Sequence, residues 1–553
     1  MTSKSGADVI VDLLRQAGVR HVFGIVSIHN MPIVDAISRT EGITLVTARH
    51  EQGAAHMADG YARASGGLGV ALGSTGPGTT NMMTGLYEAD FASSRLLVIT
   101  GQAETRFYGK AKGYVHEAEN QKRMLETVVD AAASPRHVHE VGPMLKGVIE
   151  SMYSGRPRPG AIEVPIDLQY APSSTTAPVL QLPAPLPPDT RAVEAAAALI
   201  GSARKRVIIA GGGVSSPGAR RALTGLAELL DAPVITTING KGAFPVAHPL
   251  HVGNALMRPS IKKLVSEADL VVAVGTRFQA GTGGVRLDLQ LPRMVHIDVD
   301  LRHINLNFSA EVALVSDAEL TLTALRTFDY EKGCDSYRES LCAAAVESGA
   351  RLRQSLGADH ARALDIFAQY MGSDVVFVRD STIPGYNWGN TLLPIDHPGG
   401  YVIPTSGAIG PGLPLGLGVA LATGKRTLIL HGDGGLMFHV GELAAAAQYQ
   451  IPAVVIVFND GGYGVLRGLQ SAQFDGRFNG TELHTPDFVK LAESMGVAGL
   501  HADNVEELDE RLSAAMKMTG PVLIELNANN MRPIEGVIPA PLRQKTRAMA
   551  SKS

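Results

Sequence analysis

The stretch TLILHGDGGLMFHVGELAAAAQY, residues 427–449, decides the fold of this 553-residue chain. Its first five residues form an apolar run typical of a buried parallel strand, and the run stops at Gly432, Asp433, Gly434 and Gly435. The next segment, 436–449, has the helical spacing of apolar residues and is predicted to be one helix. Glycines let backbone N–H groups approach an anion closely, and the start of a helix favours negative charge. The pattern therefore predicts a strand, a turn and a helix that together bind a diphosphate.

A metal ion is also predicted at this turn. Asp433 would repel a phosphate unless a hard divalent cation such as Mg²⁺ lies between them. The next strand, 453–460, ends at Asn459 and Asp460, shortly before Gly462. In open α/β sheets ligands bind at the carboxyl ends of the strands, so we expect these oxygen donors beside Asp433. Taken alone, each turn is equally consistent with an ordinary Asp-Gly or Asn-Asp-Gly turn.

The composition is that of a globular protein that acts on small molecules. Hydrophobic residues make up 45% and charged residues 18%, which excludes a disordered chain. The 49 basic and 53 acidic residues give a net charge of -4, so no broad basic field is available for nucleic acid or an anionic membrane. The two cysteines, Cys334 and Cys342, exclude a disulfide framework and fit a reducing cytoplasm.

No segment has the pattern of a membrane span or a signal peptide. Residues 1–18 have the spacing of an amphipathic helix. Uncharged apolar runs also stay well below the length of about 18 residues that a membrane-spanning helix needs. We therefore expect a cytoplasmic protein.

Short apolar strands alternate with helical segments three times along the chain, a pattern typical of parallel sheets with crossover helices. We predict an α/β fold of three consecutive parallel-sheet domains with helices on both faces. The predicted strands are 21–26, 43–48, 69–74, 95–101 and 161–167, then 206–213, 233–238, 270–276 and 294–300, and finally 375–381, 426–434, 453–460 and 521–527.

The domain boundaries follow from changes in composition. The stretch 170–190 is rich in Pro, Ser and Thr and is predicted to be an extended linker, while a charged helical connector spans about 330–360. The predicted organisation is a first domain, a linker, a central domain, a third domain and a C-terminal tail, at 1–170, 171–189, 190–340, 341–535 and 536–553.

The order and spacing of several motifs resemble those of the thiamine diphosphate-dependent superfamily of acetolactate synthase, benzoylformate decarboxylase and pyruvate decarboxylase, closest to acetolactate synthase-like proteins. The GDG turn at 432–434, followed by the Asn-led turn at Asn459, resembles the diphosphate fingerprint of that superfamily. The resemblance covers nearly the whole chain. It includes 22–37, 49–63 and 73–102 for a pyrimidine-binding domain, 236–250 and 271–278 for a central domain, and TSGAIGPGLPLGLG (405–418) for a cofactor clamp.

This resemblance implies that thiamine diphosphate binds together with Mg²⁺. The implied metal ligands are Asp433, the side chain of Asp460 and the carbonyl of Gly462. Many relatives have Asn at the position of Asp460, so the site in this chain carries one more negative charge. The diphosphate and its neighbourhood are expected to contact the N–H groups at Gly434 and Gly435, the strand-end residues Asp380, Ser381 and Thr382, and Tyr463. Ser and Thr at a strand end are also common turn formers.

Glu51 is the decisive residue for the chemistry. It begins an alanine-rich helix, where a carboxylate can simply complement the helix dipole. By resemblance it is instead the glutamate that hydrogen-bonds the pyrimidine ring and shares a proton with the ring nitrogen, so that the thiazolium C2 carbon becomes a nucleophile. In the clamp, Ile409 would lie beneath the bent cofactor and the carbonyl of Gly407 would accept from its exocyclic amine. Ordinary core packing is the alternative for Ile409.

The groups that move protons near the substrate are expected in the first domain. His29 lies where benzaldehyde lyase has a catalytic histidine, although a histidine after a strand is often only a turn residue. His116 lies in a loop that carries glutamine or histidines in relatives, and is a second relay candidate. Gln102, Ser74 and Thr75 line the same mouth in relatives. His431 and His439, which flank the GDG turn, are assigned structural roles.

The central domain raises the question of a flavin. RVIIAGGGVSS (206–216) lacks the GxGxxG spacing of a dinucleotide turn. In acetolactate synthases this domain binds a non-redox FAD, and HIDVD (296–300) resembles the segment that reaches the flavin ribose. GTRFQAGTGG (275–284), in contrast, departs from the arginine-bearing flavin loop. The sequence therefore leaves FAD open.

We predict an enzyme that cleaves or forms a carbon–carbon bond next to a carbonyl, as a 2-oxo acid decarboxylase with or without carboligation. A simple decarboxylase or aldehyde lyase is one alternative, and a catalytically silent cofactor-binding homologue is another. By resemblance, Glu51 of one chain meets cofactor held by the GDG turn of another chain. We therefore expect a homodimer or a tetramer of two dimers.

Overall fold

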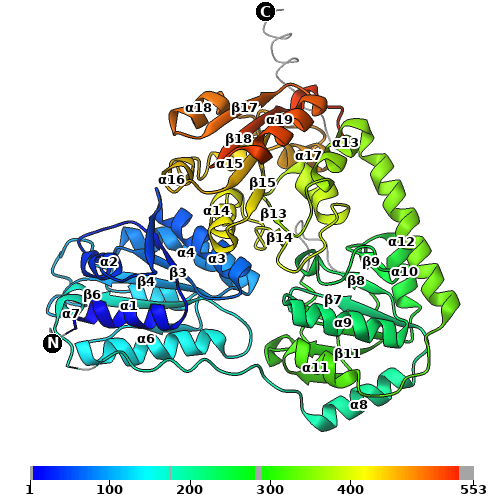
Figure 1. Ribbon diagram of the computed structural model, residues 1–553, viewed down its shortest axis with the longest axis horizontal. Helices are drawn as coiled ribbons and strands as arrows, with labels where there is room; N and C mark the ends of the chain where they lie inside the picture. Colours follow the sequence, from blue (N-terminus) through cyan, green and yellow to red (C-terminus); the bar gives the residue numbers. More distant parts are fainter. Residues whose placement is uncertain (1–3, 175, 280–288, 535–553) are drawn as a thin grey trace, which may run out of the picture.

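A computed structural model describes residues 4–174, 176–279 and 289–534. These residues form three parallel six-stranded sheets with helices packed on them, so the predicted α/β fold with three sheets is confirmed (Figure 1). The predicted tail, 536–553, and residues 280–284 of the loop compared with the flavin loop lie outside the described residues. Within the described ranges, no helix is long and apolar enough to cross a membrane. Both cysteines are free thiols.

The first sheet, blue and cyan in Figure 1, is buried on both faces, because alternate strand residues enter two separate cores. Its strands in spatial order are β2 (Thr44–Thr47), β1 (His21–Gly24), β3 (Gly69–Gly73), β4 (Leu96–Gln102), β6 (Gly160–Pro165) and β5 (Ala131–Ala133). Its helices are α1 (Gly6–Gln16), α2 (Met31–Ser38), α3 (Glu51–Ser65), α4 (Pro77–Ala92), α5 (Gln121–Glu126), α6 (Val138–Tyr153) and α7 (Ile166–Tyr170).

The middle sheet has the strand order of the classic dinucleotide-binding fold when it is followed from β9 to β12. Its strands in spatial order are β12 (Val312–Val315), β11 (Arg293–Asp298), β10 (Leu270–Val274), β7 (Arg206–Ala210), β8 (Val234–Thr236) and β9 (His251–Gly253). Its helices are α8 (Thr190–Gly201), α9 (Pro217–Leu230), η1 (Ile238–Gly240), α10 (Pro259–Ser266), η2 (Leu301–His303), α11 (Ala318–Leu325) and α12 (Asp335–Ser355). The long α12 leads to the third unit (Figure 1).

The third sheet repeats the strand order of the first. Its strands in spatial order are β14 (Tyr401–Val402), β13 (Val375–Arg379), β15 (Arg426–Gly432), β16 (Ala453–Asn459), β18 (Val522–Asn527) and β17 (Ala498–Ala502). Its helices are α13 (Gly357–Ala368), η3 (Gly385–Gly389), α14 (Gly412–Thr423), α15 (Asp433–Leu436), α16 (Glu442–Gln448), α17 (Gly464–Gln473), α18 (Phe488–Ser494), α19 (Val505–Lys517) and η4 (Ala528–Asn530).

The strand order reverses between β1 and β3 in the first sheet and between β13 and β15 in the third. Ligands of open α/β sheets bind in the crevice outside such a switch point, at the carboxyl ends of the strands. The loop after β1 carries His29, and Asp433 directly follows β15. The two switch points therefore place the predicted site residues of both units.

The predicted single helix over 436–449 is wrong. Only one helical turn, α15, follows the strand, and α16 begins at Glu442 after a non-helical segment. The break has a physical reason: His439 is buried in this segment, and its Nδ1 lies 2.9 Å from the carbonyl oxygen of Gly410. The segment turns toward the 405–412 loop instead of continuing a helix.

The first and third units pack against each other through α3 and α14. A Cβ atom at Gly60 would lie 2.1 Å from the carbonyl oxygen of Leu415, and one at Gly418 would lie 1.9 Å from that of Met57. Only glycine permits this approach of the two helix backbones. The packing brings α3, which begins with Glu51, beside the third unit of the same chain.

Candidate active site

Asp380 organises the crevice of the third sheet. It directly follows β13, is fully buried, and accepts hydrogen bonds from the backbone N–H groups of Ser381 at 2.6 Å, Gly410 at 3.0 Å and Gly412 at 2.7 Å. Three N–H donors stabilise a buried carboxylate. Asp380 thus fixes residues 405–412, here called the clamp segment, at the end of the sheet.

The clamp segment contains the predicted contacts Gly407 and Ile409. Gly407 and Gly410 have φ values of +84° and +103°, which favour glycine. The hydroxyl of Ser381 donates to the carbonyl of Ala408 at 3.0 Å, and Ile409 is half-buried between these fixed neighbours. Thr382 is buried next to Ser381. The structure therefore brings the predicted strand-end and clamp residues together.

Among the described residues, Asp433 has no positively charged partner of the kind that a buried carboxylate needs. Its side chain is 1% exposed, and neither carboxylate oxygen has a hydrogen-bond partner among the described residues. Burial, followed by the charge of Asp460, raises the pKa of Asp433 to about 7. Burial also raises the pKa of Asp460, against the opposing effect of Arg467, whose guanidinium lies 2.6 Å from it. Two buried carboxylates that repel each other suit a divalent cation.

The other residues predicted to bind the metal or the diphosphate lie around Asp433 and Asp460. Gly462 precedes Tyr463, and a Cβ atom at Gly434 would lie 2.7 Å from the ring of Tyr463. A Cβ atom at Gly435 would lie 3.1 Å from a carboxylate oxygen of Asp380. In the part of the chain that is described, no group of three or more His, Cys, Asp and Glu side chains could hold a metal. The described part of the site thus offers two carboxylates, which leaves a backbone carbonyl, such as that of Gly462, or a neutral side-chain oxygen as a further protein ligand.

Glu51 is the first residue of α3, in the first unit. The side-chain amide of Asn81, on α4, donates to Glu51 Oε2 at 2.9 Å. The second carboxylate oxygen, Oε1, lies 3.4 Å from the place of a Cβ atom at Gly78. A Cβ atom at position 78 would thus be in van der Waals contact with the carboxylate, which Asn81 orients through the other oxygen.

His29 and His116 form a pair at the switch point of the first sheet. His29 is 1% exposed, and its Nδ1 lies 3.2 Å from the hydroxyl of Ser74, which follows β3. The rings of His29 and His116 are 5.5 Å apart, and Nε2 of His29 has no hydrogen-bond partner in the described ranges. Burial, followed by repulsion from His116, lowers the pKa of His29. His29 is therefore neutral at pH 7.

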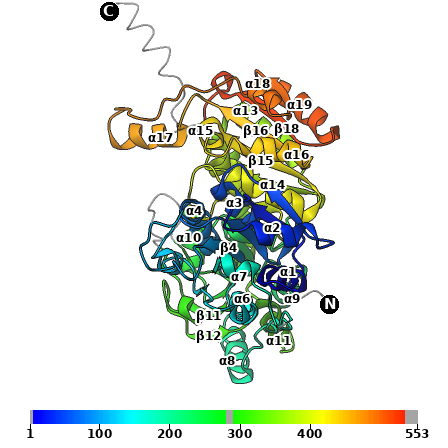
Figure 2. The ribbon, with the colours of Figure 1, turned by 90° about the vertical axis from the view of Figure 1, so that its left-hand side faces the viewer.

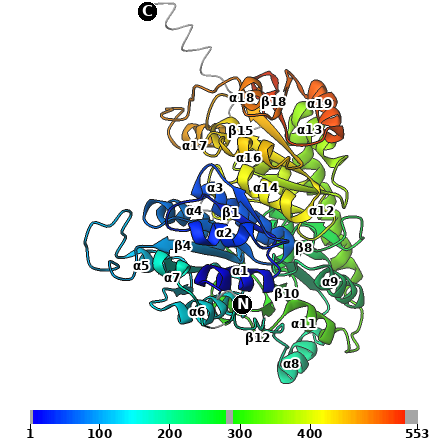
Figure 3. The same cartoon turned by 60° about the vertical axis from the view of Figure 1, so that its left-hand side comes forward.

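His116 lies in the loop between β4 and α5, which projects from the first unit in Figure 3. It is exposed and has a φ of +60°. The hydroxyl of Thr75 donates to its carbonyl oxygen at 3.2 Å and to the side chain of Gln121 at 3.0 Å. These contacts fix the backbone of the loop at the mouth of the crevice.

Gln102 is fully buried below this loop. Its amide nitrogen lies 3.2 Å from the carboxylate of Glu163, and that of Gln121 lies 3.0 Å from the same oxygen. Glu163 also accepts from Tyr108 and from Ser134. Gln102 is thus part of a buried hydrogen-bond network that supports the loop of His116.

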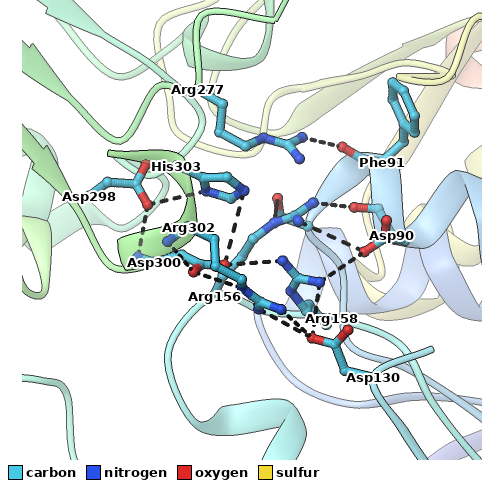
Figure 4. A network of polar contacts seen from close by, with 11 residues as sticks. Asp90, Phe91, Asp130, Arg156, Arg158, Arg277, Asp298, Asp300, Arg302 and His303 are labelled. Carbon is cyan, nitrogen blue, oxygen red and sulfur yellow. Dashed lines mark hydrogen bonds and ion pairs between the residues drawn. The ribbon is translucent and has the colours of Figure 1, made fainter. Parts of the chain in front are cut away.

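Ion pairs join the middle unit to the first (Figure 4). Asp300, from the HIDVD segment, contacts Arg158 at 3.1 Å and Arg302 at 3.1 Å, while Asp298 lies 3.5 Å from His303. Burial alone would raise the pKa of Asp300, but the hydrogen bonds from Arg302 hold it well below its usual range. The two carboxylates of the segment that resembles a flavin contact therefore already have partners within the chain.

The sequence missed several residues that hold the site together. Asn81, Gln121, Glu442 and Arg467 each contact a predicted site residue or the backbone beside it. Their partners are distant in the sequence, except for Arg467, so no local motif marks them. Arg467 lies seven residues after Asp460, on α17, which projects from the third unit in Figure 2; a basic residue on the helix after a metal turn was the available signal.

Comparison with known proteins gives three matches to thiamine pyrophosphate enzyme domains: the N-terminal TPP binding domain at residues 4–125, the central domain at 193–325 and the C-terminal TPP binding domain at 386–526. The chain is 35% identical to a probable 2-ketoarginine decarboxylase of Pseudomonas aeruginosa, with 94% of each chain covered. It is 30% identical to a probable acetolactate synthase large subunit of Methanococcus aeolicus, with 94% of this chain and 91% of that protein covered. The chain therefore belongs to the thiamine pyrophosphate enzymes, and the predicted class of a thiamine diphosphate-dependent decarboxylase or carboligase is confirmed.

Proposed function

We propose that this enzyme uses thiamine diphosphate and Mg²⁺ to decarboxylate a 2-oxo acid, and that it then releases the aldehyde or passes the acyl unit to a second carbonyl. The observation that carries the proposal is the buried Asp433, whose two carboxylate oxygens have no hydrogen-bond partner among the described residues, beside Asp460 at the switch point of the third sheet. A divalent cation bound there would compensate the charges of the Asp433 and Asp460 carboxylates and would also hold a diphosphate on the glycine turn.

Thiamine diphosphate, when bound, would supply the carbon nucleophile and the electron sink that decarboxylation of a 2-oxo acid needs. The residues of the chain position the cofactor and transfer protons. Glu51, held by Asn81, shares a proton with the pyrimidine ring nitrogen. Ile409, in a clamp segment fixed by Asp380, would contact the bound cofactor. Neutral His29 takes and returns protons at the carbonyl oxygen of the substrate.

The metal assignment predicts the effect of Asp433→Asn. We expect the affinity for thiamine diphosphate with Mg²⁺ to fall by about 10- to 100-fold, the range seen when partners of metal ligands are lost. The apoprotein should be at least as stable as wild type, because a carboxyl group whose folded pKa is raised to about 7 costs stability once pH exceeds its unfolded pKa. Calorimetry and thermal unfolding with and without cofactor measure both effects; unchanged affinity would exclude Asp433 as a ligand.

A second chain is needed to complete the site in this proposal. Glu51 of one chain serves cofactor held by the GDG turn of its partner, so the smallest active unit is a dimer, and two dimers form a tetramer. Exposed apolar side chains support an interface at both half-sites, since large apolar patches on a surface mark contact regions. They are Val26, Ile28, Met31 and Val115 near His29, and Met437 and Phe438 after the GDG turn.

The residues of the central domain fit FAD less well than the residues around the GDG turn fit thiamine diphosphate. The carboxylates of Asp298 and Asp300 are already engaged by His303, Arg158 and Arg302, and a flavin ribose would have to compete with these ion pairs (Figure 4). We therefore propose an enzyme without flavin. The protein purified from cells grown with riboflavin should show no flavin absorption band and release no fluorescent flavin on heating; a stoichiometric flavin would overturn this proposal.

The apoenzyme reconstituted with thiamine diphosphate and Mg²⁺ tests the function. A panel of 2-oxo acids should include pyruvate, a branched-chain acid, benzoylformate and 2-ketoarginine, the last because of the name of the Pseudomonas relative. Carbon dioxide release with free aldehyde indicates a simple decarboxylase, and release with a hydroxyketone product indicates a carboligase. Cleavage of hydroxyketones without carbon dioxide indicates an aldehyde lyase. Cofactor binding without any of these reactions indicates the silent homologue.

A further inference from the structure

We propose that Glu442 is a positioning residue that holds Glu51 of its own chain in place, and that it thereby connects the two active sites of a dimer. The inference rests on the proposed function in one respect, namely that Glu51 serves the site of the partner chain. Glu442 itself belongs to the third unit, nine residues after Asp433, which binds the metal at the other site. One chain thus contributes to both sites through a single direct contact.

The contact is made with the backbone at the start of α3. Glu442 begins α16 and is 1% exposed, and its Oε1 accepts from the N–H of Arg49 at 3.0 Å and from that of His50 at 3.1 Å. Its Oε2 also lies 3.1 Å from the N–H of Arg49. Arg49 and His50 directly precede Glu51, so the carboxylate of Glu442 fixes the turn from which the Glu51 side chain extends.

Two further side chains of the same segment hold this turn. The hydroxyl of Tyr449 accepts from the N–H of Thr47 at 2.8 Å, and the side chain of Gln448 accepts from the guanidinium of Arg49 at 2.7 Å. Residues 442–449, here called the latch segment, therefore contact the chain from the end of β2 to the start of α3. In Figures 1 and 3, α16 lies at the edge of the third unit that faces the first.

The carboxylate of Glu442 packs closely against the first turn of α3. A Cβ atom at Gly53 would lie 2.3 Å from Glu442 Oε1, so a larger residue on the first turn of α3 would displace the carboxylate. The group is also costly to bury: burial raises the pKa of Glu442 to about 7, against the two backbone N–H donors. Packing alone would be served by an apolar residue here, whereas a carboxylate with two backbone partners fixes one orientation of the turn.

Only a short stretch of chain separates the metal turn from the latch segment. The one-turn α15, which begins with Asp433, and the five non-helical residues 437–441 precede α16. Glu442 therefore lies between the metal turn, which serves one site, and the backbone that precedes Glu51, which acts at the other site.

The first test is Glu442→Gln, which keeps the shape and one carbonyl acceptor. We expect folding and the affinity for thiamine diphosphate with Mg²⁺ to be retained. Exchange of the cofactor C2 proton should slow by about 10- to 100-fold, since a misplacement near 1 Å costs about that much. Glu140→Gln is the matched control, because Glu140 also accepts from two backbone N–H groups at the start of a helix, those of Arg136 and His137, and lies outside the latch segment and the predicted site. Wild-type exchange in Glu442→Gln would overturn the proposal.

Hybrid dimers separate the two chains. In the reference hybrid, one chain carries Asp433→Ala and the other Glu51→Gln, so the only complete site uses Glu51 of the first chain and the metal turn of the second. Two affinity tags isolate this hybrid after co-expression. The cofactor bound at this complete site should exchange its C2 proton. If the reference hybrid is inactive, the shared site itself is wrong, and the failure belongs to the proposed dimer rather than to Glu442.

Glu442→Gln is then added to either chain of an active reference hybrid. In the first chain, which supplies Glu51, we expect exchange to fall by about 10- to 100-fold. In the second chain, which supplies the metal turn, exchange should stay near that of the reference hybrid. Loss in the second chain instead, equal loss in both, or loss in neither would each overturn the proposal, because Glu442 would then act on the diphosphate side, on overall structure, or not at all.

Discussion

Replacing Glu51 with Gln is expected to slow hydrogen–deuterium exchange at C2 of bound thiamine diphosphate by about 10²- to 10⁴-fold, the usual contribution of a general acid–base group. The amide of Gln occupies the same space and can still face Asn81, which holds Oε2 of the glutamate at 2.9 Å. It cannot, however, share a proton with the pyrimidine nitrogen. Exchange is followed by acid quenching and proton NMR of the released cofactor.

Two controls make this result specific. Affinity for the cofactor and thermal stability should remain close to wild type, since the metal turn is unchanged. Glu140→Gln is the matched variant: Glu140 also lies in the first turn of a helix, α6, where it caps the backbone far from the predicted site. If Glu51→Gln exchanges as fast as wild type, Glu51 only complements the dipole of α3, which is the alternative that the sequence left open.

The sequence predicted every central strand and, of the six edge strands, only β2. The five strands that it did not predict are β5, β9, β12, β14 and β17, and each except β17 has two to four residues. All five lie at an edge of their sheet. Central parallel strands are buried on both faces and are apolar throughout, whereas an edge strand needs less apolar surface. Segments such as Ala131–Ala133 therefore carry no strand pattern.

The same distinction separates the site residues that the sequence predicted from those that it missed. Asp433 and Asp460 follow apolar strands, so the pattern of the strand predicted where their side chains would stand. Glu442 had no such signal, because its partners are two backbone N–H groups almost 400 residues away, which no local pattern contains. The broken helix at 437–441 has the same origin, since it depends on the contact between His439 and Gly410. Contacts that join two units become predictable only when the units have been placed.

His29→Ala is expected to lower turnover of the true 2-oxo acid by about 10²- to 10⁴-fold. Cofactor affinity and C2 exchange should remain, because Glu51, its partner Asn81 and the metal turn are unchanged; the defect then lies in the steps after the substrate adds. His29 is buried, and its Nε2 has no hydrogen-bond partner within the described residues, so that nitrogen is available to a substrate oxygen. Unchanged turnover would make His29 a turn residue, with His116 the better relay candidate.

The pH profile distinguishes a proton-transfer role from a loss of packing. Burial and the neighbouring charge of His116 lower the pKa of His29, so it stays neutral and able to accept a proton until the pH falls below about 6.5, the ordinary value for histidine. Activity should therefore decline on the acid side only below that pH. His116→Gln removes the repulsion and leaves the burial, so the pKa of His29 rises and the acid limb of kcat/KM moves to higher pH. A limb that stays in place, measured with a substrate that does not titrate in this range, would show that His29 does not govern it.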